Sequence, residues 1–378
     1  MKADLGLAME KKLRVWGKAK RAAETLTTPV LVMDTETIQQ DYEQFLSSFP
    51  GAGLFFALKA NSDLGVACLF RDLGSGFEVG SEGTLRLLLE LGVPASKIIS
   101  GNTLKTPEFL KHAYSYGVRK FTFDSQAEID KMALLAPNSQ VYVRIAVSNN
   151  YSEWPLDKKF GIEEEKAADL LVTAREAGLQ PVGIAFHPGS QCINAAGWTE
   201  GLAQCNRVWD EAARRGIALN SLNLGGGFPT EYTRPVPSVH EVASAVHQSL
   251  GRLFPRETEV LLEPGRGLVG EAGIMVTTVI AKASRQGQNW IYLDAGVFNG
   301  LMESIGGIRY PMWTDKKGNT SGYTVAGPSC DSMDTFPGEF ELPELEIGDR
   351  VYIMSAGAYT TAYASHFDGI PIPKVVLV

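Results

Sequence analysis

The chain has 378 residues, of which 44% are hydrophobic and 21% charged, close to the average of soluble globular proteins. This composition excludes a disordered, collagen-like or coiled-coil protein, and the length predicts about two domains or one barrel with an appendage. The 35 basic and 43 acidic residues give a net charge of −8. Since this charge repels a polyanion overall, we do not expect the protein to bind nucleic acid.

Four cysteines, at positions 68, 192, 205 and 330, form no CxxC pair and no metal-ligand spacing. This usage fits a reducing compartment rather than a disulfide framework, and it predicts no metal site. No apolar run reaches the roughly 18–20 residues of a membrane span. No apolar stretch of signal-peptide type follows the first residues. We therefore expect a cytoplasmic protein that does not enter a membrane.

From about residue 29 to 270, short β-branched or aromatic runs alternate with segments of helical period. The strand-like runs are residues 54–58, 97–100, 120–123, 141–145, 182–186, 221–224 and 259–263. The helical segments between them include residues 83–91, 106–116, 126–135, 164–177 and 200–215. Repeated βα units of roughly 30 residues indicate a parallel sheet, open or closed. Seven or eight units in this length match a (β/α)₈ TIM-type barrel, so we predict an α/β fold of that kind.

After about residue 270 the pattern changes to short strands separated by Gly, Pro and Asp. These runs are residues 274–280, 290–293, 323–326 and 350–354. They predict a second, antiparallel β domain of sandwich or barrel-like form. We place the barrel domain at residues 36–268. The β domain then comprises residues 269–378 together with residues 1–35, whose first part has a helical pattern.

Several polar side chains stand where the predicted barrel strands end, which is where barrel enzymes carry their reactive groups. Lys59 directly follows an apolar strand, so it is either a surface lysine or a desolvated amine able to form a Schiff base. His187 ends another apolar strand and fits a structural imidazole as well as a cofactor contact. Arg144 lies within a central strand, where a buried cation needs a partner or a ligand.

Two glycine turns follow successive predicted strands near the end of the barrel. The first, Gly225-Gly226-Gly227, lets backbone N–H groups converge on an anion such as a phosphate. The second, Glu263-Pro-Gly-Arg266, adds a guanidinium, and this pair of turns matches the phosphate position after the last two strands of many barrels. A carboxylate there is unsuited to the phosphate itself. Glu263 is therefore predicted to serve another group, such as a pyridinium nitrogen.

Together these motifs resemble the barrel-type (fold type III) pyridoxal-phosphate-dependent decarboxylases, which act on ornithine, lysine, diaminopimelate or arginine. The resemblance runs from about Pro29 to the last residues. Its motifs occupy residues 57–61, 76–78, 100–105, 122–125, 154–161, 186–191, 225–229, 263–266, 327–331 and 357–360. The segment that begins Cys330-Asp331 is similar to the bacterial ornithine or lysine/ornithine branch, whereas the diaminopimelate branch usually has Glu after that cysteine.

The resemblance implies that pyridoxal 5'-phosphate is the cofactor and assigns roles around it. Lys59 would form the Schiff base and His187 would stack on the pyridine ring. Glu263 would keep the ring nitrogen protonated, which makes the ring an electron sink after CO₂ leaves. The phosphate would be bound by Ser190, Gly226, Gly227, Gly265, the backbone of Arg266, and Tyr359 from the β domain.

Further roles follow from the same resemblance. Glu78 stands where the family usually has Asp and would neighbour Lys59, while Arg144 would support the site. Cys330 would protonate the carbanion, and Asp331 would face the distal amine of the substrate. In the family these last two residues belong to the other subunit, so the resemblance implies a homodimer with shared active sites.

The substrate side departs from the family pattern. Ornithine-type enzymes place a further acidic residue in the segment that contains Glu303, which is the only carboxylate between Asp294 and Asp315. Glu303 either contacts the distal amine or is a solvated loop carboxylate. Tyr359 and Phe367 are the other candidate substrate contacts.

The resemblance implies decarboxylation of a basic L-amino acid, ornithine or lysine or both, to putrescine or cadaverine in polyamine biosynthesis. The alternatives are diaminopimelate or a larger amine-bearing amino acid as substrate, a catalytically dead regulatory paralogue, and a barrel-type racemase. A dead paralogue would lose the lysine, the acid or the phosphate contacts, all of which this chain retains. A racemase normally has Arg at the pyridine nitrogen, which Glu263 argues against.

Overall fold

The computed structural model describes residues 2–378, with side chains from residue 9 onward. The chain divides into two compact units. The barrel unit comprises Tyr42–Pro229 and Val236–Gly265, and the β unit comprises Met1–Asp41, Thr230–Pro235 and Arg266–Val378. The domain limits at residues 36 and 268 stay a prediction.

The barrel unit contains a closed barrel of eight parallel strands, as the alternating sequence pattern predicts. In spatial order these are β2 (Gly53–Ala57), β3 (Gly76–Glu78), β4 (Ile98–Ser100), β5 (Lys120–Phe123), β6 (Gln140–Arg144), β8 (Gln180–Ala185), β10 (Ser221–Asn223) and β11 (Glu259–Leu262). Seven of them overlap the predicted runs. The eighth, β3, has only three residues, and its Gly and Glu are both depleted in strands.

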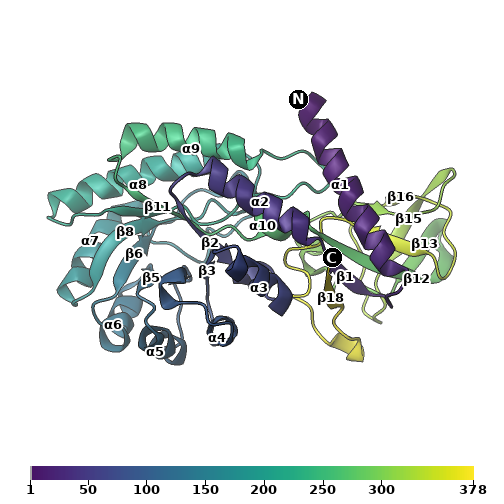
Figure 1. The fold of residues 1–378 in the computed structure, drawn as a ribbon, viewed down its shortest axis with the longest axis horizontal. Coiled ribbons are helices and arrows are strands. Elements are labelled where there is room, and N and C mark those ends of the chain that lie inside the picture. Colours follow the sequence, from purple (N-terminus) through teal and green to yellow (C-terminus); the bar gives the residue numbers. More distant parts are fainter. Residues whose placement is uncertain (1) are drawn as a thin grey trace. The chain divides into compact units, whose positions relative to one another are not determined.

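Helices lie on the outside of the barrel strands (Figure 1). They are α3 (Leu64–Asp72), α4 (Glu82–Glu90), α5 (Pro107–Tyr116), α6 (Gln126–Leu135), α7 (Glu164–Glu176), α8 (Ala196–Arg214) and α9 (Val239–Leu253). Sequence periodicity locates α4 to α8 but neither α3 nor α9, although α9 begins with a capping box in which Ser238 and Glu241 bond reciprocally. Strands β7 (Ser152–Trp154) and β9 (Ser190–Cys192) form a separate antiparallel pair beside the barrel.

The β unit is built on an eight-stranded sheet. Its strands are β1 (Val30–Met33), β12 (Gly273–Arg285), β13 (Gln288–Leu293), β14 (Met312–Trp313), β15 (Thr320–Ala326), β16 (Phe340–Pro343), β17 (Arg350–Ile353) and β18 (Lys374–Leu377). Most pairings are antiparallel, as expected, but β13 runs parallel to β15 and β1 runs parallel to β18. A parallel pair needs a long crossover. The crossover between β13 and β15 contains no α-helix, so the sequence gives no signal for it.

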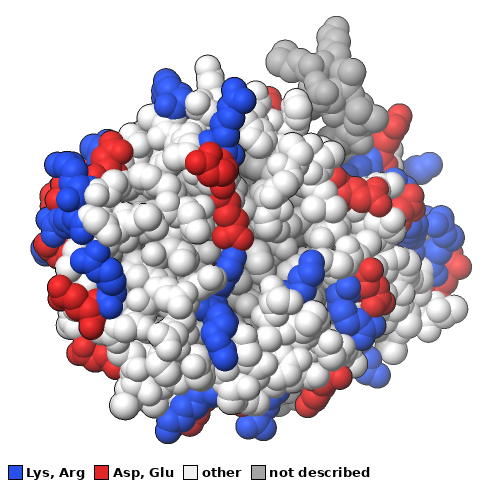
Figure 2. Space-filling view, turned by 60° about the vertical axis from the view of Figure 1, so that its left-hand side comes forward, with Lys and Arg blue, Asp and Glu red and all other residues white. Residues whose placement is uncertain are grey.

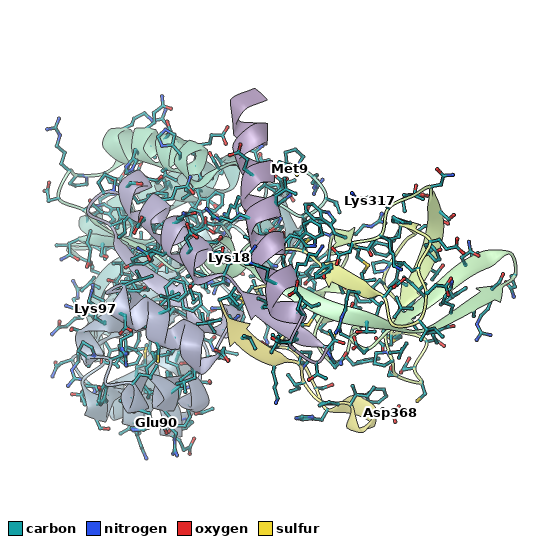
Figure 3. All side chains as sticks on the ribbon, turned by 45° about the vertical axis from the view of Figure 1, so that its right-hand side comes forward. Met9, Lys18, Glu90, Lys97, Lys317 and Asp368 are labelled. Atoms are coloured by element: carbon teal, nitrogen blue, oxygen red, sulfur yellow. The ribbon has the colours of Figure 1, made fainter. Side chains whose placement is uncertain are left out.

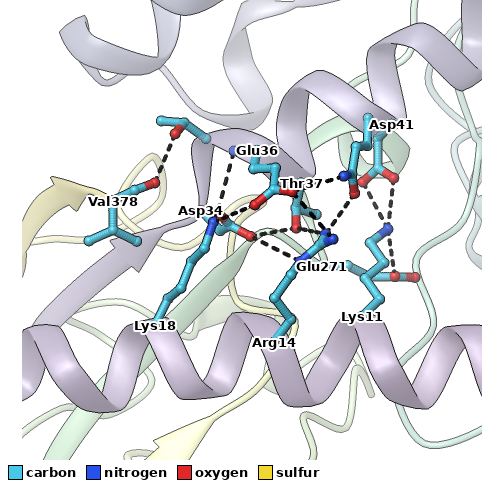
Figure 4. Close-up of polar contacts among 11 residues, drawn as sticks. Lys11, Arg14, Lys18, Asp34, Glu36, Thr37, Asp41, Glu271 and Val378 are labelled. Carbon is cyan, nitrogen blue, oxygen red and sulfur yellow. Dashed lines mark hydrogen bonds and ion pairs between the residues drawn. The ribbon is translucent and has the colours of Figure 1, made fainter.

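Helix α1 (Lys2–Ala23) belongs to the β unit and confirms the helical pattern of the first residues. On its apolar side, Val15 and Ala19 belong to one hydrophobic cluster with Ile274 of β12. Its basic side is paired rather than free: Lys11 contacts Asp41 and Glu271, and Lys18 contacts Asp34 (Figure 4). The two sides together attach α1 to the sheet. Helix α2 (Thr35–Ser48) begins in the β unit and ends in the barrel unit.

Charges of both signs are interspersed on the face of the molecule that Figure 2 shows. Among the helices of residues 2–378, none is both long and apolar enough to cross a bilayer. The same residues contain no cluster of His, Cys, Asp and Glu that could hold a metal ion.

Candidate active site

Lys59 and Glu78 meet at the carboxyl ends of two adjacent barrel strands. Lys59 lies in a short 3₁₀ turn directly after β2, and Glu78 is the last residue of β3, which pairs with β2. The Lys59 Nζ donates to Glu78 Oε2 over 2.6 Å. Glu78 is 1% exposed, whereas the Lys59 side chain is 59% exposed. The amine is therefore accessible to a ligand while its counterion is buried.

Glu263 directly follows β11 and is buried in the same unit. Its Oε1 accepts a hydrogen bond of 2.6 Å from the amide of Asn223, the last residue of β10. Burial raises the pKa of Glu263 to about 7, and the charge of Glu78 adds to the rise, while Lys59 and Asn223 act in the opposite direction. A small change in surroundings can thus protonate or ionise this carboxyl near neutral pH.

Asn223 is a site residue that the sequence analysis missed. It ends β10, but the predicted run extends one residue further, to Leu224, so the strand-end rule applied to the sequence does not select Asn223.

His187 and Arg144 also stand at strand ends, after β8 and at the end of β6. Burial lowers the pKa of His187 well below its usual value, and the nearby Arg144 and Lys59 charges lower it further. Its Nδ1 accepts the Gly189 N–H over 3.0 Å, so a neutral ring carries its proton on Nε2. The Arg144 guanidinium lies 5.3 Å from the centre of the Phe160 ring. This end of the barrel therefore combines a neutral imidazole with two cations and two carboxyls.

The glycine turn after β10 forms a cradle made of backbone. Gly225 and Gly227 have φ angles of +65° and +90°, which side chains rarely adopt. A Cβ on Gly226 would lie 2.6 Å from the Glu263 carbonyl oxygen and 3.3 Å from His187 Nε2. A Cβ at any of these three positions would collide with backbone atoms of adjacent loops of the same chain. Only glycine therefore allows the glycine turn to lie this close to those loops.

The β unit holds a buried cluster around Arg266, the first residue of α10 (Arg266–Val269). The Arg266 guanidinium donates to both carboxylate oxygens of Glu303 and to the Tyr232 hydroxyl, each over 2.7 Å. It also lies 4.8 Å from the centre of the Tyr359 ring. Both charged side chains are 3% exposed. Arg266 and Glu303 therefore form a buried, bidentate salt bridge beside the rings of Tyr232 and Tyr359.

This cluster corrects one of the two sequence interpretations of Glu303. The residue is 2% exposed and lies in the short 3₁₀ helix Met302–Ser304, so it is not a solvated loop carboxylate. Both of its oxygens are already engaged by Arg266, a partner that the sequence analysis did not assign to it.

Cys330 and Asp331 lie in an exposed turn after β15. The turn is organised by buried Asp334, whose carboxylate accepts two backbone N–H groups. Phe367 is 42% exposed, and its ring centre lies 4.8 Å from that of Phe298. The neighbouring Asp368, labelled in Figure 3, has a φ of +57°, a conformation that Asn and Asp tolerate better than most residues.

Comparison with known proteins identifies the family. The family described as "Pyridoxal-dependent decarboxylase, pyridoxal binding domain" matches residues 35–270. The lysine/ornithine decarboxylase of Selenomonas ruminantium is 39% identical over 95% of this chain and 92% of its own. The ornithine decarboxylase of Caenorhabditis elegans is 30% identical over 92% and 87%. The chain belongs to the pyridoxal-dependent decarboxylases.

Solved structures agree with this assignment. The lysine decarboxylase of Selenomonas ruminantium superposes with a TM-score of 0.88 at 38% identity, covering 95% of this chain and 94% of that one. The lysine/ornithine decarboxylase of Vibrio vulnificus, solved with cadaverine, gives 0.89 at 30% identity, covering 96% and 98%. The predicted family, the barrel fold and the pyridoxal phosphate cofactor are confirmed.

Proposed function

We propose that this decarboxylase acts on a basic L-amino acid, ornithine or lysine or both, and releases putrescine or cadaverine for polyamine biosynthesis. The observation that carries the proposal is the group Lys59, Glu78 and Glu263, which three strand ends bring together in the barrel unit. The names of the similar proteins point to the substrate class, since they are lysine/ornithine and ornithine decarboxylases.

The residues at the barrel end fit the cofactor. The glycine turn after β10 presents backbone N–H groups without side chains, which suits a phosphate. Separately, Oε1 of buried Glu78 has no hydrogen-bond partner among the described residues. Lys59 offers an accessible amine to the cofactor aldehyde, and Glu78 orients that amine. Within the barrel unit, Ser190, Gly226, Gly227 and Gly265 would hold the phosphate.

Bound pyridoxal phosphate supplies the electron sink for the pair of electrons left when CO₂ departs. Glu263 would accept a hydrogen bond from the protonated ring nitrogen, and the positive charge of that nitrogen would favour the ionised form of this buried carboxyl. Asn223 orients that carboxyl through its hydrogen bond. The neutral His187 imidazole would cover the cofactor ring, and Arg144 balances the two carboxyls at this end of the barrel.

Cys330 and Asp331 act on the substrate from a second subunit of a homodimer. Both are exposed on the single chain, as reactive groups that serve a partner's site must be. The β unit also exposes large apolar side chains that a partner surface would cover, namely Met333, Tyr363 and Phe367. Cys330 donates a proton to the substrate carbon after CO₂ loss, and Asp331 pairs with the distal ammonium. Tyr359 and Phe367 line the substrate.

The cluster around Arg266 bears on substrate choice. Because Glu303 already neutralises the guanidinium, Arg266 is a poor partner for a distal carboxylate, and Glu303 itself is a poor partner for a distal ammonium. Asp331 then carries amine recognition directly or through water. Diaminopimelate should be a poor substrate, since its distal carboxylate would meet Asp331.

A substrate panel tests this function: ornithine, lysine, arginine, diaminopimelate and larger amine-bearing amino acids, each scored by kcat/KM. We expect activity on both ornithine and lysine, with discrimination of about 1–3 kcal/mol, the usual value of one methylene in a pocket. A clear preference for diaminopimelate, or for a substrate without a distal amine, would overturn the substrate assignment. Loss of optical activity without CO₂ release would indicate a racemase instead.

A further inference from the structure

Lys105 is a buried lysine that no step above uses. Its side chain is fully buried in the barrel unit, after β4. The Nζ donates to three backbone carbonyls: those of Asn102 and Thr103 at 3.1 Å and that of Thr122 on β5 at 2.6 Å. One ammonium thus joins the loop after β4 to the end of the next strand.

The charge of this ammonium is costly to bury and is only partly balanced. Burial lowers the pKa of Lys105 to about 8, although Glu128 on α6 opposes the shift. Glu128 Oε2 lies 3.2 Å from the Lys105 Nζ. Lys131, also on α6, shares the same carboxylate and donates to the Lys105 carbonyl. An aliphatic side chain would avoid the desolvation cost, so the three carbonyl bonds are the reason to have a lysine here.

The loop that Lys105 holds lies directly against Glu263. A Cβ built on Gly101 would lie 2.3 Å from Glu263 Oε1 and 2.4 Å from Oε2. The backbone at Gly101 therefore touches the carboxylate itself. On another side, Asn223 donates to Oε1. The position of the Glu263 carboxyl is set by the amide of Asn223 and by the loop.

We propose that Lys105 is a positioning residue for the reaction: its ammonium fixes the loop of residues 101–105, and the loop fixes the carboxyl of Glu263. Without the ammonium, three carbonyl dipoles converge on an apolar gap and repel one another, so the loop moves away and Glu263 gains freedom. The inference rests on the proposed role of Glu263 at the cofactor ring nitrogen.

The test compares Lys105→Met with Lys97→Met. Lys97 stands at the opposite end of the same strand, is exposed, and also donates to a backbone carbonyl, that of Gly74 (Figure 3). We expect Lys105→Met to lower kcat by about 10- to 100-fold, the effect of misplacing a reacting group by about 1 Å, with little change in KM. The pH dependence of the visible absorbance of bound cofactor should also shift. Lys97→Met should change neither.

A double-mutant cycle with Glu263→Gln separates positioning from a general loss of structure. If Lys105 acts through Glu263, adding Lys105→Met to Glu263→Gln should cost less than about threefold in kcat, because coupled residues are not additive. Equal losses in both backgrounds would overturn the inference while leaving the proposed function intact. A Glu263→Gln variant of near wild-type rate would instead overturn the proposed role of Glu263.

Gly101→Val provides a second route in case Lys105→Met fails to fold. This variant leaves Lys105 in place and puts carbon atoms where the Glu263 carboxylate now lies. We expect the same fall in kcat, the same spectral shift and the same lack of additivity with Glu263→Gln. A wild-type rate and an unshifted absorbance titration in Gly101→Val would show that the loop does not set the position of Glu263.

Discussion

The barrel unit and the β unit each bury a glutamate that the sequence selects as a site residue, and they treat it in opposite ways. Burial, and after it the charge of nearby Glu78, raises the pKa of Glu263 to about 7, and the single hydrogen bond from the neutral Asn223 amide only partly opposes this rise. Glu303 receives two bonds from a guanidinium. Burial alone therefore does not mark a reactive carboxyl. The hydrogen-bond partner decides the role of the carboxyl: a neutral amide leaves the protonation of Glu263 free to change near pH 7, whereas a guanidinium forms a structural ion pair with Glu303.

The largest effect should come from the accessible amine of the barrel unit. Lys59→Ala should abolish activity and the visible absorbance of the purified holoenzyme, because no amine remains to bind the cofactor aldehyde. Lys111→Ala, at an exposed position of α5, is the matched control. If the Lys59 variant keeps the band and borohydride traps no other lysine, Lys59 is not the anchor.

In the β unit, the comparison predicts a stability effect. Glu303→Gln leaves the Arg266 guanidinium buried without its counter-charge, so unfolding free energy should fall by about 3–5 kcal/mol. Chemical denaturation with a spectroscopic probe measures this loss, and the exposed Glu341→Gln provides the control. A small loss in stability combined with a large change in the ornithine-to-lysine ratio would instead assign Glu303 to the substrate.

For Glu263 the expected effect is on rate. Glu263→Gln should retain the cofactor but lose on the order of 10²–10³ in kcat, the usual size of a missing electrostatic contact in a transition state. Single-turnover CO₂ release measures the step directly. Near wild-type turnover would mean that the reaction does not need Glu263 to keep the ring nitrogen protonated. Glu263 would then contribute no more to the reaction than Glu303 does.

The same residue should lower the stability of the cofactor-free protein. The pKa of Glu263 is about 7 in the folded chain and 4.5 in the reference state, so folding favours the protonated form. Stability from this group is present below pH 4.5 and falls as the pH rises toward 7. Glu263→Gln should therefore gain up to about 3 kcal/mol over wild type between pH 4.5 and 8. Thermal unfolding of wild type and Glu263→Gln at pH 4.5 and at pH 8 measures the difference in stability between them. A difference that is the same at both pH values would contradict the prediction.

The two units also differ in how far the sequence predicts them. Parallel strands of a barrel end on one rim, so the strand-end positions of Lys59 and Glu263 suffice to predict that they are neighbours. Arg266 and Glu303 are separated by 37 residues and meet through the crossover between β13 and β15. No periodicity specifies that connection, so the sequence assigns the two residues to different ligands.

The smallest effect concerns Cys330 and a partner subunit. In a shared-site homodimer, Lys59 and Cys330 of one site come from different chains. Random exchange of Lys59→Ala and Cys330→Ala subunits makes half of the dimers hybrid, and each hybrid has one intact site and one site with both defects. Diamine formation should then recover to about a quarter of the wild-type level per site, as a two-fold symmetric dimer requires.

Cys330→Ala alone should still release CO₂ but form the amine slowly, since it lacks only the proton donor for the substrate carbon. The measured product must therefore be the diamine, and labelled subunits must show that exchange took place. The decisive control is a mixture of Lys59→Ala with the double variant Lys59→Ala/Cys330→Ala, in which every site lacks the lysine and no activity can return. If exchange is complete and the first mixture stays inactive as well, each chain carries a complete site, and the exposed turn of Cys330 serves its own barrel rather than that of a partner.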